Sequence, residues 1–437
     1  MSFPRPNRHH EDFVQQNLRR NVLALGGDFA LYMIGLAFAS QATILPAFAE
    51  ALGAPNVVIG AIPAATTLGW LLPSVFVAGH TETLSKKLPF VLRYTIWERA
   101  PYLALAFAAF VVADRSPTIA LAILLIVLLG MTGVSGALLP AWMEVVGHAI
   151  PITLRGRFFA VSSIIACLGG LAASFATASI LAAIRAPASY VVCFLAATVC
   201  MALSYVVLLF TREPPAVTPP ADSVPLRAYL ARIPALLRRD RNMAWFLTAR
   251  AFTVVGVIGS AFFTVYALRV LGAPAWRVGL FTTMLLIGQV VGNLVFGWLG
   301  DRMGHRLVLA AGTAAMAGAN LLALLAHSVD LLLVAFLLDG VYEAALSVSS
   351  LNILLEMAPA LSERPTYVGL GRSAVAPIAC AAALLSGLLV DAAGFASVFA
   401  VSTAFCVIAL AVLLIRVREP RYLAAIAAPL DSESQST

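Results

Sequence analysis

The chain has 437 residues, of which 61% are hydrophobic and 11% charged, and its mean hydropathy is +0.94. So apolar a composition excludes an ordinary water-soluble globule. The net charge of +7 does not indicate nucleic-acid binding, because most Lys and Arg residues fall in segments between apolar runs on one expected side of a membrane.

Apolar runs of roughly 20 residues recur about twelve times along the chain, and each is long enough to cross a bilayer as a helix. A polar, basic arm over 1–20 precedes the first run, which covers about 22–48 and contains Asp28. The second run covers about 57–79, and the third begins near Leu88. Because backbone polar groups inside a bilayer must be satisfied within their own segment, the runs predict helices and exclude open sheets.

A long interruption at 212–241 divides the chain into two halves. Its first part is Pro-rich and predicts a linker. Its second part, LRAYLARIPALLRRDR, has apolar residues on one helical face and arginines on the other, which predicts a short helix at the cytoplasmic membrane surface. We interpret this region mainly as a tether; a lipid or partner contact is the alternative. The predicted domains are therefore an N-terminal bundle at 1–211 and a C-terminal bundle with a disordered tail at 242–437.

The turn after the eighth run, from Gly297 to Arg306, reads GWLGDRMGHR. Two apolar helices joined by so short a link need Gly297, Gly300 and Gly304 for close backbone approach and free φ angles. Asp301 is an acid beside Arg302 and Arg306, so it can stay ionised and accept hydrogen bonds from a neighbouring helix N-terminus. Taken alone, the stretch also fits an ordinary charged cytoplasmic turn.

The first half holds a second copy of this region. Leu-Gly-Ala-Pro at 52–55 reappears at 271–274, and the same offset places Glu82 on Asp301. A repeat of half the chain length is typical of a two-halved transporter. The turn resembles the loop signature of the major facilitator superfamily, G-x-L-x-D-R-x-G-(R/K)-(R/K), with His305 as a mild departure; the matching residues are Gly297, Leu299, Asp301, Arg302, Gly304 and Arg306.

The resemblance implies an all-α membrane protein with about twelve transmembrane helices in two pseudo-symmetric six-helix bundles that rock about a midplane site. It also implies a gate. By pseudo-symmetry Asp301 should face Arg157 at the start of the fifth run, and Glu82 should face Arg372 at the start of the eleventh. These acid–arginine contacts would latch the cytoplasmic side in the outward-open state.

Charged residues inside the apolar runs are candidate functional groups, because each costs at least about 2.5–3.5 kcal/mol at bilayer depth. Asp339 and Glu343 stand one helical turn apart in the tenth run, with Tyr342 beside them and Asn352 further along. Two carboxylates so close in a low dielectric cannot both ionise cheaply, so we expect them to bind protons or substrate. The alternative is that both acids are neutral, or paired with a basic residue that positions the helix.

Two further groups of charges need partners. The first and seventh runs face each other in the family, so the resemblance suggests an ion pair between Asp28 and Arg250. In the third run Glu98 and Arg99 are adjacent and point about 100° apart, so their partners must come from another helix. We expect a structural charge network there, comprising Arg93, Glu98 and Arg99.

The sequence therefore predicts a secondary transporter of a small solute that works by alternating access. We expect proton coupling and lean slightly to efflux, with proton-coupled uptake as the alternative, although the Gly-Pro element of drug–proton antiporters is missing from the fifth run. A non-transporting receptor or membrane assembly partner of the same fold is the rival of another class. No nucleophile–base pair, phosphate loop or metal cluster is evident, so we expect neither an enzyme nor a cofactor or metal. The expected state is a monomer in a bacterial inner membrane with both termini cytoplasmic.

Overall fold

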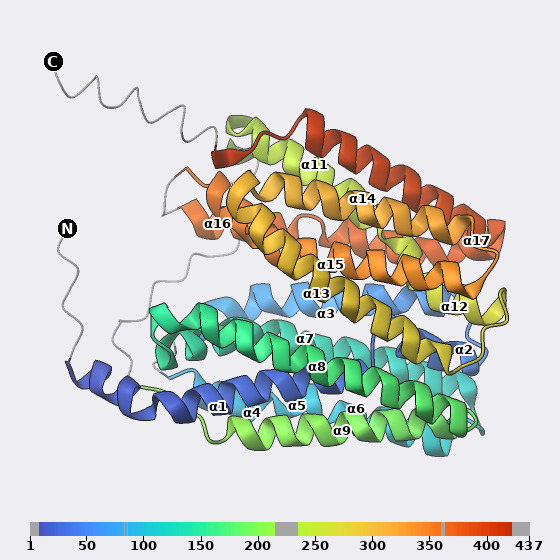
Figure 1. The fold of residues 1–437 in the computed structure, drawn as a ribbon, viewed down its shortest axis with the longest axis horizontal. Helices are drawn as coiled ribbons and strands as arrows, with labels where there is room; N and C mark the ends of the chain where they lie inside the picture. The colour runs from blue at the N-terminus through green and yellow to red at the C-terminus, as the bar shows by residue number, and fades with distance from the viewer. Residues whose placement is uncertain (1–7, 83, 85, 215–234, 360–362, 422–437) are drawn as a thin grey trace. The chain divides into compact units, whose positions relative to one another are not determined.

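The computed structural model describes the chain except residues 1–7, 83, 85, 215–234, 360–362 and 422–437. Within the described residues all regular structure is helical (Figure 1). The chain divides into two compact units, each described here by itself. Unit 1 comprises 1–54, 65–224 and 275–280, and unit 2 comprises 55–64, 225–274 and 281–437. The predicted surface helix of the linker lies largely outside the described residues.

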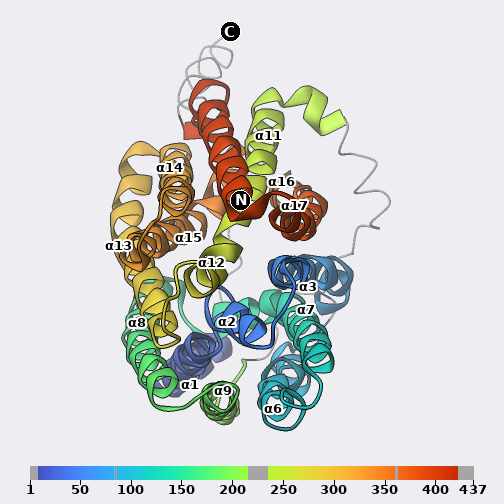
Figure 2. The ribbon, with the colours of Figure 1, turned by 90° about the vertical axis from the view of Figure 1, so that its right-hand side faces the viewer.

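The N-terminal half begins with two helices where one long run is expected. Pro46 explains the break, because a proline has no N–H to donate and is tolerated in the first turn of the second helix. The third run is also divided, at Thr95 and again before Pro101. The helices are α1 (Arg8–Phe38), α2 (Ile44–Ala51), α3 (Asn56–Glu82), α4 (Leu88–Tyr94), α5 (Ile96–Arg99), α6 (Pro101–Phe107), the π-helix η1 (Ala108–Val112), α7 (Pro117–Ala149), α8 (Ile152–Ala183) and α9 (Ala188–Leu208). In unit 1, α1 packs against both α8 and α9 (Figure 2).

The C-terminal half repeats this plan, including a divided first run. Its helices are α11 (Arg241–Gly256), the 3₁₀-helix η2 (Ile258–Phe262), α12 (Phe263–Arg269), α13 (Arg277–Met303), α14 (His305–Leu324), α15 (Val329–Met357), α16 (Arg364–Ser373) and α17 (Ala376–Ile415). Gly394 interrupts α17 with φ 76° and ψ 172°, a conformation that only glycine adopts readily, so α17 is two helices. In unit 2, α14 packs against α15 and α17.

The helices are long enough to span a bilayer. In the described part of the chain, 10 helical stretches qualify by length and apolar composition. One of them, 366–415, contains the break at Gly394 and so supplies two spans, and α3 is a further apolar helix. The helices therefore match the number of crossings that the sequence predicts.

Each unit contains a backbone clamp that the sequence analysis missed. In unit 1 the Asn21 amide donates to the Arg212 carbonyl oxygen at 2.9 Å and accepts from the Arg212 N–H at 2.8 Å. In unit 2 Asn242 makes the same two bonds with Arg418, at 3.0 and 2.7 Å. Each clamp ties the first helix of a half to the segment that follows its last helix. The available signal was Arg-Glu-Pro, which occurs at 212–214 and again at 418–420.

The glutamate of each Arg-Glu-Pro segment caps a helix start. Glu213 accepts the backbone N–H groups of Lys87 and Leu88 at 2.9 and 2.8 Å, where α4 begins. Glu419 accepts the backbone N–H of Arg306 at 3.0 Å, in the first turn of α14. The first N–H groups of a helix have no partner within the helix, and a carboxylate there also benefits from the helix dipole. The duplication thus extends to side chains that fix the turn after the second and eighth runs.

We predict that Glu213→Ala lowers the free energy of unfolding by about 1–3 kcal/mol, because two buried N–H groups lose a charged acceptor. Burial alone would raise the pKa of the Glu213 carboxyl, but the His148 side chain and the two backbone N–H groups outweigh burial and lower the pKa. A lowered pKa means that the stabilisation is complete above the ordinary Glu value of about 4.3 and is lost as pH falls through the folded-state value.

Denaturant unfolding of the wild type and the Glu213→Ala variant at several pH values measures this effect. The matched control is Glu144→Ala, because the Glu144 side chain is 41% exposed and its ion pair with Lys87 should contribute less than about 1 kcal/mol. If the difference in free energy of unfolding between Glu213→Ala and the wild type did not change with pH, loss of the capping carboxylate would not be the cause of the destabilisation.

Candidate functional site

Asp339 lies in the middle of α15 and is only 4% exposed. Its position is fixed by a close crossing of α13 and α15, where a Cβ on Gly340 would lie 2.0 Å from the Leu285 carbonyl oxygen and a Cβ on Gly288 would lie 2.0 Å from the Leu337 carbonyl oxygen. Within the described part of the chain, no hydrogen bond or ion pair reaches the Asp339 carboxylate. A buried carboxylate without partners is costly when ionised, so this group favours binding a proton.

Glu343 follows one turn later on α15 and is exposed, so the two acids differ in environment. Arg250 on α11 is half-buried and interacts electrostatically with Glu343 and with the buried Tyr342. Glu343 in turn interacts with Asp339. The structure thus brings together Asp339, Tyr342, Glu343 and Arg250, a set with two carboxyl groups and one guanidinium. With both acids ionised the set carries one surplus negative charge, which a proton or a cationic group can neutralise.

Asn352 does not join this set. It lies nine residues beyond Glu343, which places it about half a turn around the helix axis. Its side-chain amide donates to the Val348 carbonyl oxygen of its own helix at 2.7 Å. Because the amide is used locally and projects from another side of α15, Asn352 has no geometric link to the two acids.

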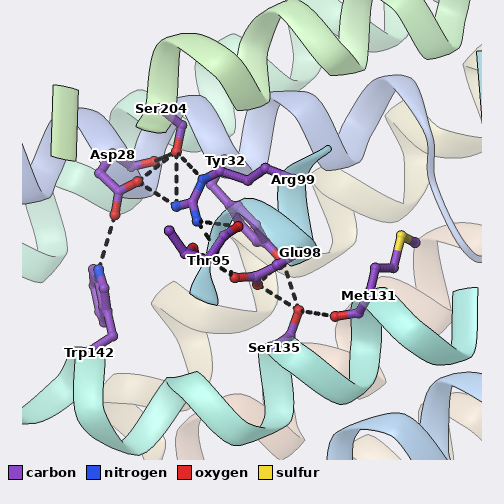
Figure 3. Close-up of polar contacts among 9 residues, drawn as sticks. All are labelled: Asp28, Tyr32, Thr95, Glu98, Arg99, Met131, Ser135, Trp142 and Ser204. Carbon is purple, nitrogen blue, oxygen red and sulfur yellow. Dashed lines mark hydrogen bonds and ion pairs between the residues drawn. The ribbon is translucent and has the colours of Figure 1, made fainter. Parts of the chain in front are cut away.

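Asp28 is paired within unit 1, so the expected ion pair with Arg250 is wrong. The Asp28 Oδ1 lies 2.7 Å from the Arg99 guanidinium, and the Ser204 hydroxyl donates to the same oxygen at 2.6 Å. The Trp142 indole N–H donates to Oδ2 at 3.0 Å (Figure 3). Asp28 is 2% exposed and Arg99 is 6% exposed, so a guanidinium of the same unit satisfies the buried carboxylate. Helix spacing in the sequence could not reveal this pair, because it joins α1 to α5.

Glu98 belongs to the same cluster. Its Oε1 accepts the Tyr32 hydroxyl at 2.7 Å and the Ser135 hydroxyl at 2.6 Å, and its Oε2 accepts the Thr95 hydroxyl at 3.2 Å. The Arg99 Nη1 lies 3.6 Å from Oε2, although the two residues are adjacent. The long Arg99 side chain folds back along α5, and the same nitrogen lies 3.5 Å from the Thr95 carbonyl oxygen. Helical spacing alone therefore underestimates what a flexible arginine can reach.

Arg93 lies apart from this cluster, so its predicted place in the charge network is wrong. Its side chain is exposed, and its guanidinium carbon lies 5.7 Å from the centroid of the Tyr94 ring. The cause is its position on α4, before the break at Thr95. We name the remaining set the unit 1 cluster; its members are Asp28, Tyr32, Thr95, Glu98, Arg99, Ser135, Trp142 and Ser204.

In the predicted gating turn, Gly304 is essential but Gly297 is not. Gly304 has φ 89°, and a Cβ there would lie 2.3 Å from the Glu419 side chain. Gly297 is helical, and a Cβ there would meet nothing within 4 Å, so the expected close approach at Gly297 is wrong. Arg306 donates from its side chain to the Val417 carbonyl oxygen at 2.8 Å, and Arg302 lies 4.7 Å from the Trp298 ring centroid. These contacts hold the turn against its own unit.

The predicted latch contacts remain predictions. Asp301 and Arg157 are both exposed, and they belong to different units. The side chains of Glu82 and Arg372 lie outside the described residues. The turn has another strong contact that the sequence did not indicate: Arg421 pairs with Glu356 at 2.7 Å and donates to the carbonyl oxygen of Asp301 at 3.0 Å.

Comparison with known proteins agrees with the helical membrane fold described above. The family model described as Major Facilitator Superfamily matches residues 268–431. A mutant of nucleoside transporter NupG has a similar structure, with 15% sequence identity and a TM-score of 0.69 over 90% of this chain and 98% of that chain. A POT family transporter in complex with 5-aminolevulinic acid matches at 14% identity and TM-score 0.63, over 90% of this chain and 94% of that chain. A mutant peptide transporter POT in complex with alafosfalin matches at 16% identity and TM-score 0.62, over 90% and 93%. No curated protein matches the sequence.

Proposed function

We propose that this chain is a secondary transporter of the major facilitator superfamily, and that it moves a small polar solute in exchange or together with protons bound on α15. The observation that carries the proposal is Asp339: a carboxylate at mid-helix, 4% exposed, without a hydrogen bond or ion pair in the described part of the chain. Intramembrane acids that lack a fixed partner typically mark ion or proton pathways.

The neighbouring groups support a coupled cycle. Glu343 is the exposed acid of the set and interacts electrostatically with Arg250, so a solute group can compete for this interaction. When Asp339 binds a proton, the set becomes neutral and its passage through a low-dielectric state costs less. When Asp339 releases the proton, the surplus negative charge returns. Proton binding and solute binding therefore act on the same charge balance, which is the physical basis of coupling.

The solute class follows from this charge balance. A site with two carboxyl groups and one guanidinium recognises solutes that carry hydrogen-bond donors, an amine or a zwitterion. The structural neighbours include nucleoside and peptide transporters, and two of the structures hold 5-aminolevulinic acid or alafosfalin. We propose the same broad class, small and polar, for this chain.

Purified protein in proteoliposomes tests the proposal. A panel of labelled nucleosides, dipeptides, amino acids and amines is offered with and without an imposed pH gradient of either sign. We expect at least one member to move only in protein-containing vesicles and to accumulate with the gradient; the sign that drives accumulation gives the direction, export or uptake. Protein-free vesicles are the control. If no member of such a panel moved, while a purified partner protein bound the chain, the non-transporting alternative would replace this proposal.

A further inference from the structure

Two exposed arginines lie at the backbone clamp of unit 1. Arg20 precedes the clamp residue Asn21 on α1, and its Nε donates to the Phe210 carbonyl oxygen at 2.6 Å. The Arg20 guanidinium carbon lies 6.0 Å from the centroid of the Phe210 ring. Arg212 takes part in the clamp through its backbone alone, so its exposed side chain can make other contacts. The clamp therefore places two guanidinium groups at one end of the packed helices α1 and α9.

Unit 2 repeats this arrangement, with a closer aromatic contact. Arg241 precedes the clamp residue Asn242 and lies one turn before Trp245, so Arg241 and Trp245 share one face of α11. The Arg416 guanidinium carbon lies 5.2 Å from the centroid of the Trp245 ring. Arg418 again uses its backbone for the clamp and has an exposed side chain. Three arginines thus lie where α11 begins and α17 ends.

The charges of these arginines are not balanced by neighbouring acids. In the part of the chain that the structure describes, no carboxylate forms an ion pair with any of the five guanidinium groups. The five are those of Arg20, Arg212, Arg241, Arg416 and Arg418. Asp240 is next to Arg241 in the chain, but its carboxylate accepts the Met243 N–H at 3.0 Å and the Tyr367 hydroxyl at 2.8 Å. Each set of arginines therefore has a surplus of positive charge that an anion can balance.

Both sets of arginines lie at the edge of an apolar surface. The side chains at the adjoining span ends are largely exposed: Phe210 is 54% exposed in unit 1, and Ile415 is 76% exposed in unit 2. Exposed apolar side chains at the end of a membrane span contact lipid, and aromatic rings beside them are typical of the membrane–water interface. A ligand that matches both features has an anionic group joined to an apolar part. This combination favours an anionic phospholipid over a free phosphate.

We propose that each clamp builds a binding site for the headgroup of an anionic phospholipid. The unit 1 lipid site comprises Arg20 and Arg212, and the unit 2 lipid site comprises Arg241, Arg416 and Arg418. Arginine suits this role because its planar guanidinium forms two parallel hydrogen bonds with a phosphate. This end of the spans is the expected cytoplasmic side, where anionic headgroups attract arginines next to a membrane span. The proposal goes beyond the proposed function and does not depend on it, because lipid binding is measured without transport.

Native mass spectrometry of the purified full-length protein, titrated with phosphatidylglycerol, tests the proposal. At a lipid concentration that fills both sites in the wild type, we expect two bound lipids in the wild type. We expect one bound lipid in Arg20→Gln with Arg212→Gln, and one in Arg241→Gln with Arg416→Gln. Each arginine removed should weaken binding at its site about fivefold. The clamp of unit 1 uses only the backbone of residue 212, so it should survive the substitution, which thermal unfolding checks.

The matched control removes two exposed arginines outside both lipid sites, Arg93→Gln with Arg364→Gln, and should retain both lipids. Loss of lipid from this control would show attraction to net charge alone and would overturn the proposal. Equal retention of phosphatidylcholine and phosphatidylglycerol by the wild type, or unchanged binding in both double variants, would also overturn it. Inorganic phosphate should not displace the lipid at equal concentration; displacement would overturn the choice of a phospholipid.

Discussion

Asp339→Asn should abolish accumulation driven by a pH gradient while leaving solute exchange intact. The substitution keeps the size of the side chain and mimics a permanently protonated acid. Residue 339 is then always neutral and cannot release a proton. A gradient of about one pH unit supplies about 1.4 kcal/mol for each proton moved, which corresponds to about tenfold accumulation for one coupled proton. In the variant the solute should only reach equal concentrations on the two sides of the membrane.

The measurement compares net accumulation with exchange of labelled for unlabelled solute in the same proteoliposomes. Exchange needs only solute binding and rocking of the two halves, so it should persist in Asp339→Asn. The matched control is Asp114→Asn, because Asp114 is exposed in the loop before α7 and should leave both activities unchanged. A variant that still accumulates solute tenfold, or a transport rate with the same flat pH dependence in wild type and Asp339→Asn, would remove Asp339 from the coupling mechanism.

The fold could be predicted from the sequence because two strong signals agree. Hydropathy sets the number of helices, and the repeat of 52–55 at 271–274 sets their organisation into halves. Hydropathy is averaged over long stretches of chain and the repeat lies outside the broken segments, so neither signal is affected by the unexpected breaks after α1 and before α6. Gly304 could also be predicted, since the shortness of the turn demands a residue that tolerates positive φ.

The side-chain pairs could not be predicted in the same way. Asp28 and Arg99 are 71 residues apart, and nothing in periodicity says that α1 and α5 bring them together. The breaks that divide the third run also change which face each of its charges presents, so Arg93 lies apart while Glu98 and Arg99 join one cluster. By contrast, Asp339 and Glu343 share one regular helix, where spacing alone fixes their relation. Sequence reasoning is therefore reliable within an unbroken helix and weak across helices.

Arg99→Met should produce the largest loss of stability among single substitutions in the unit 1 cluster. Removal of one partner of a buried ion pair leaves an uncompensated charge, and the typical cost is about 3–5 kcal/mol. Arg99 is 6% exposed and also donates to the Ser204 hydroxyl at 3.2 and 3.3 Å, so several contacts are lost together. Methionine preserves much of the length and fills the space, which separates the loss of charge from the loss of volume.

Denaturant unfolding in detergent or lipid measures this effect, with Arg93→Met as the matched control. Arg93 is exposed, so its replacement should change the free energy of unfolding by less than about 0.5 kcal/mol. The double variant Asp28→Asn with Arg99→Met should recover much of the lost stability, because neutralising the orphaned carboxylate removes the cause of the penalty. Equal destabilisation in the single and double variants would mean that packing around Arg99, and not its pairing with Asp28, holds α1 to the third span.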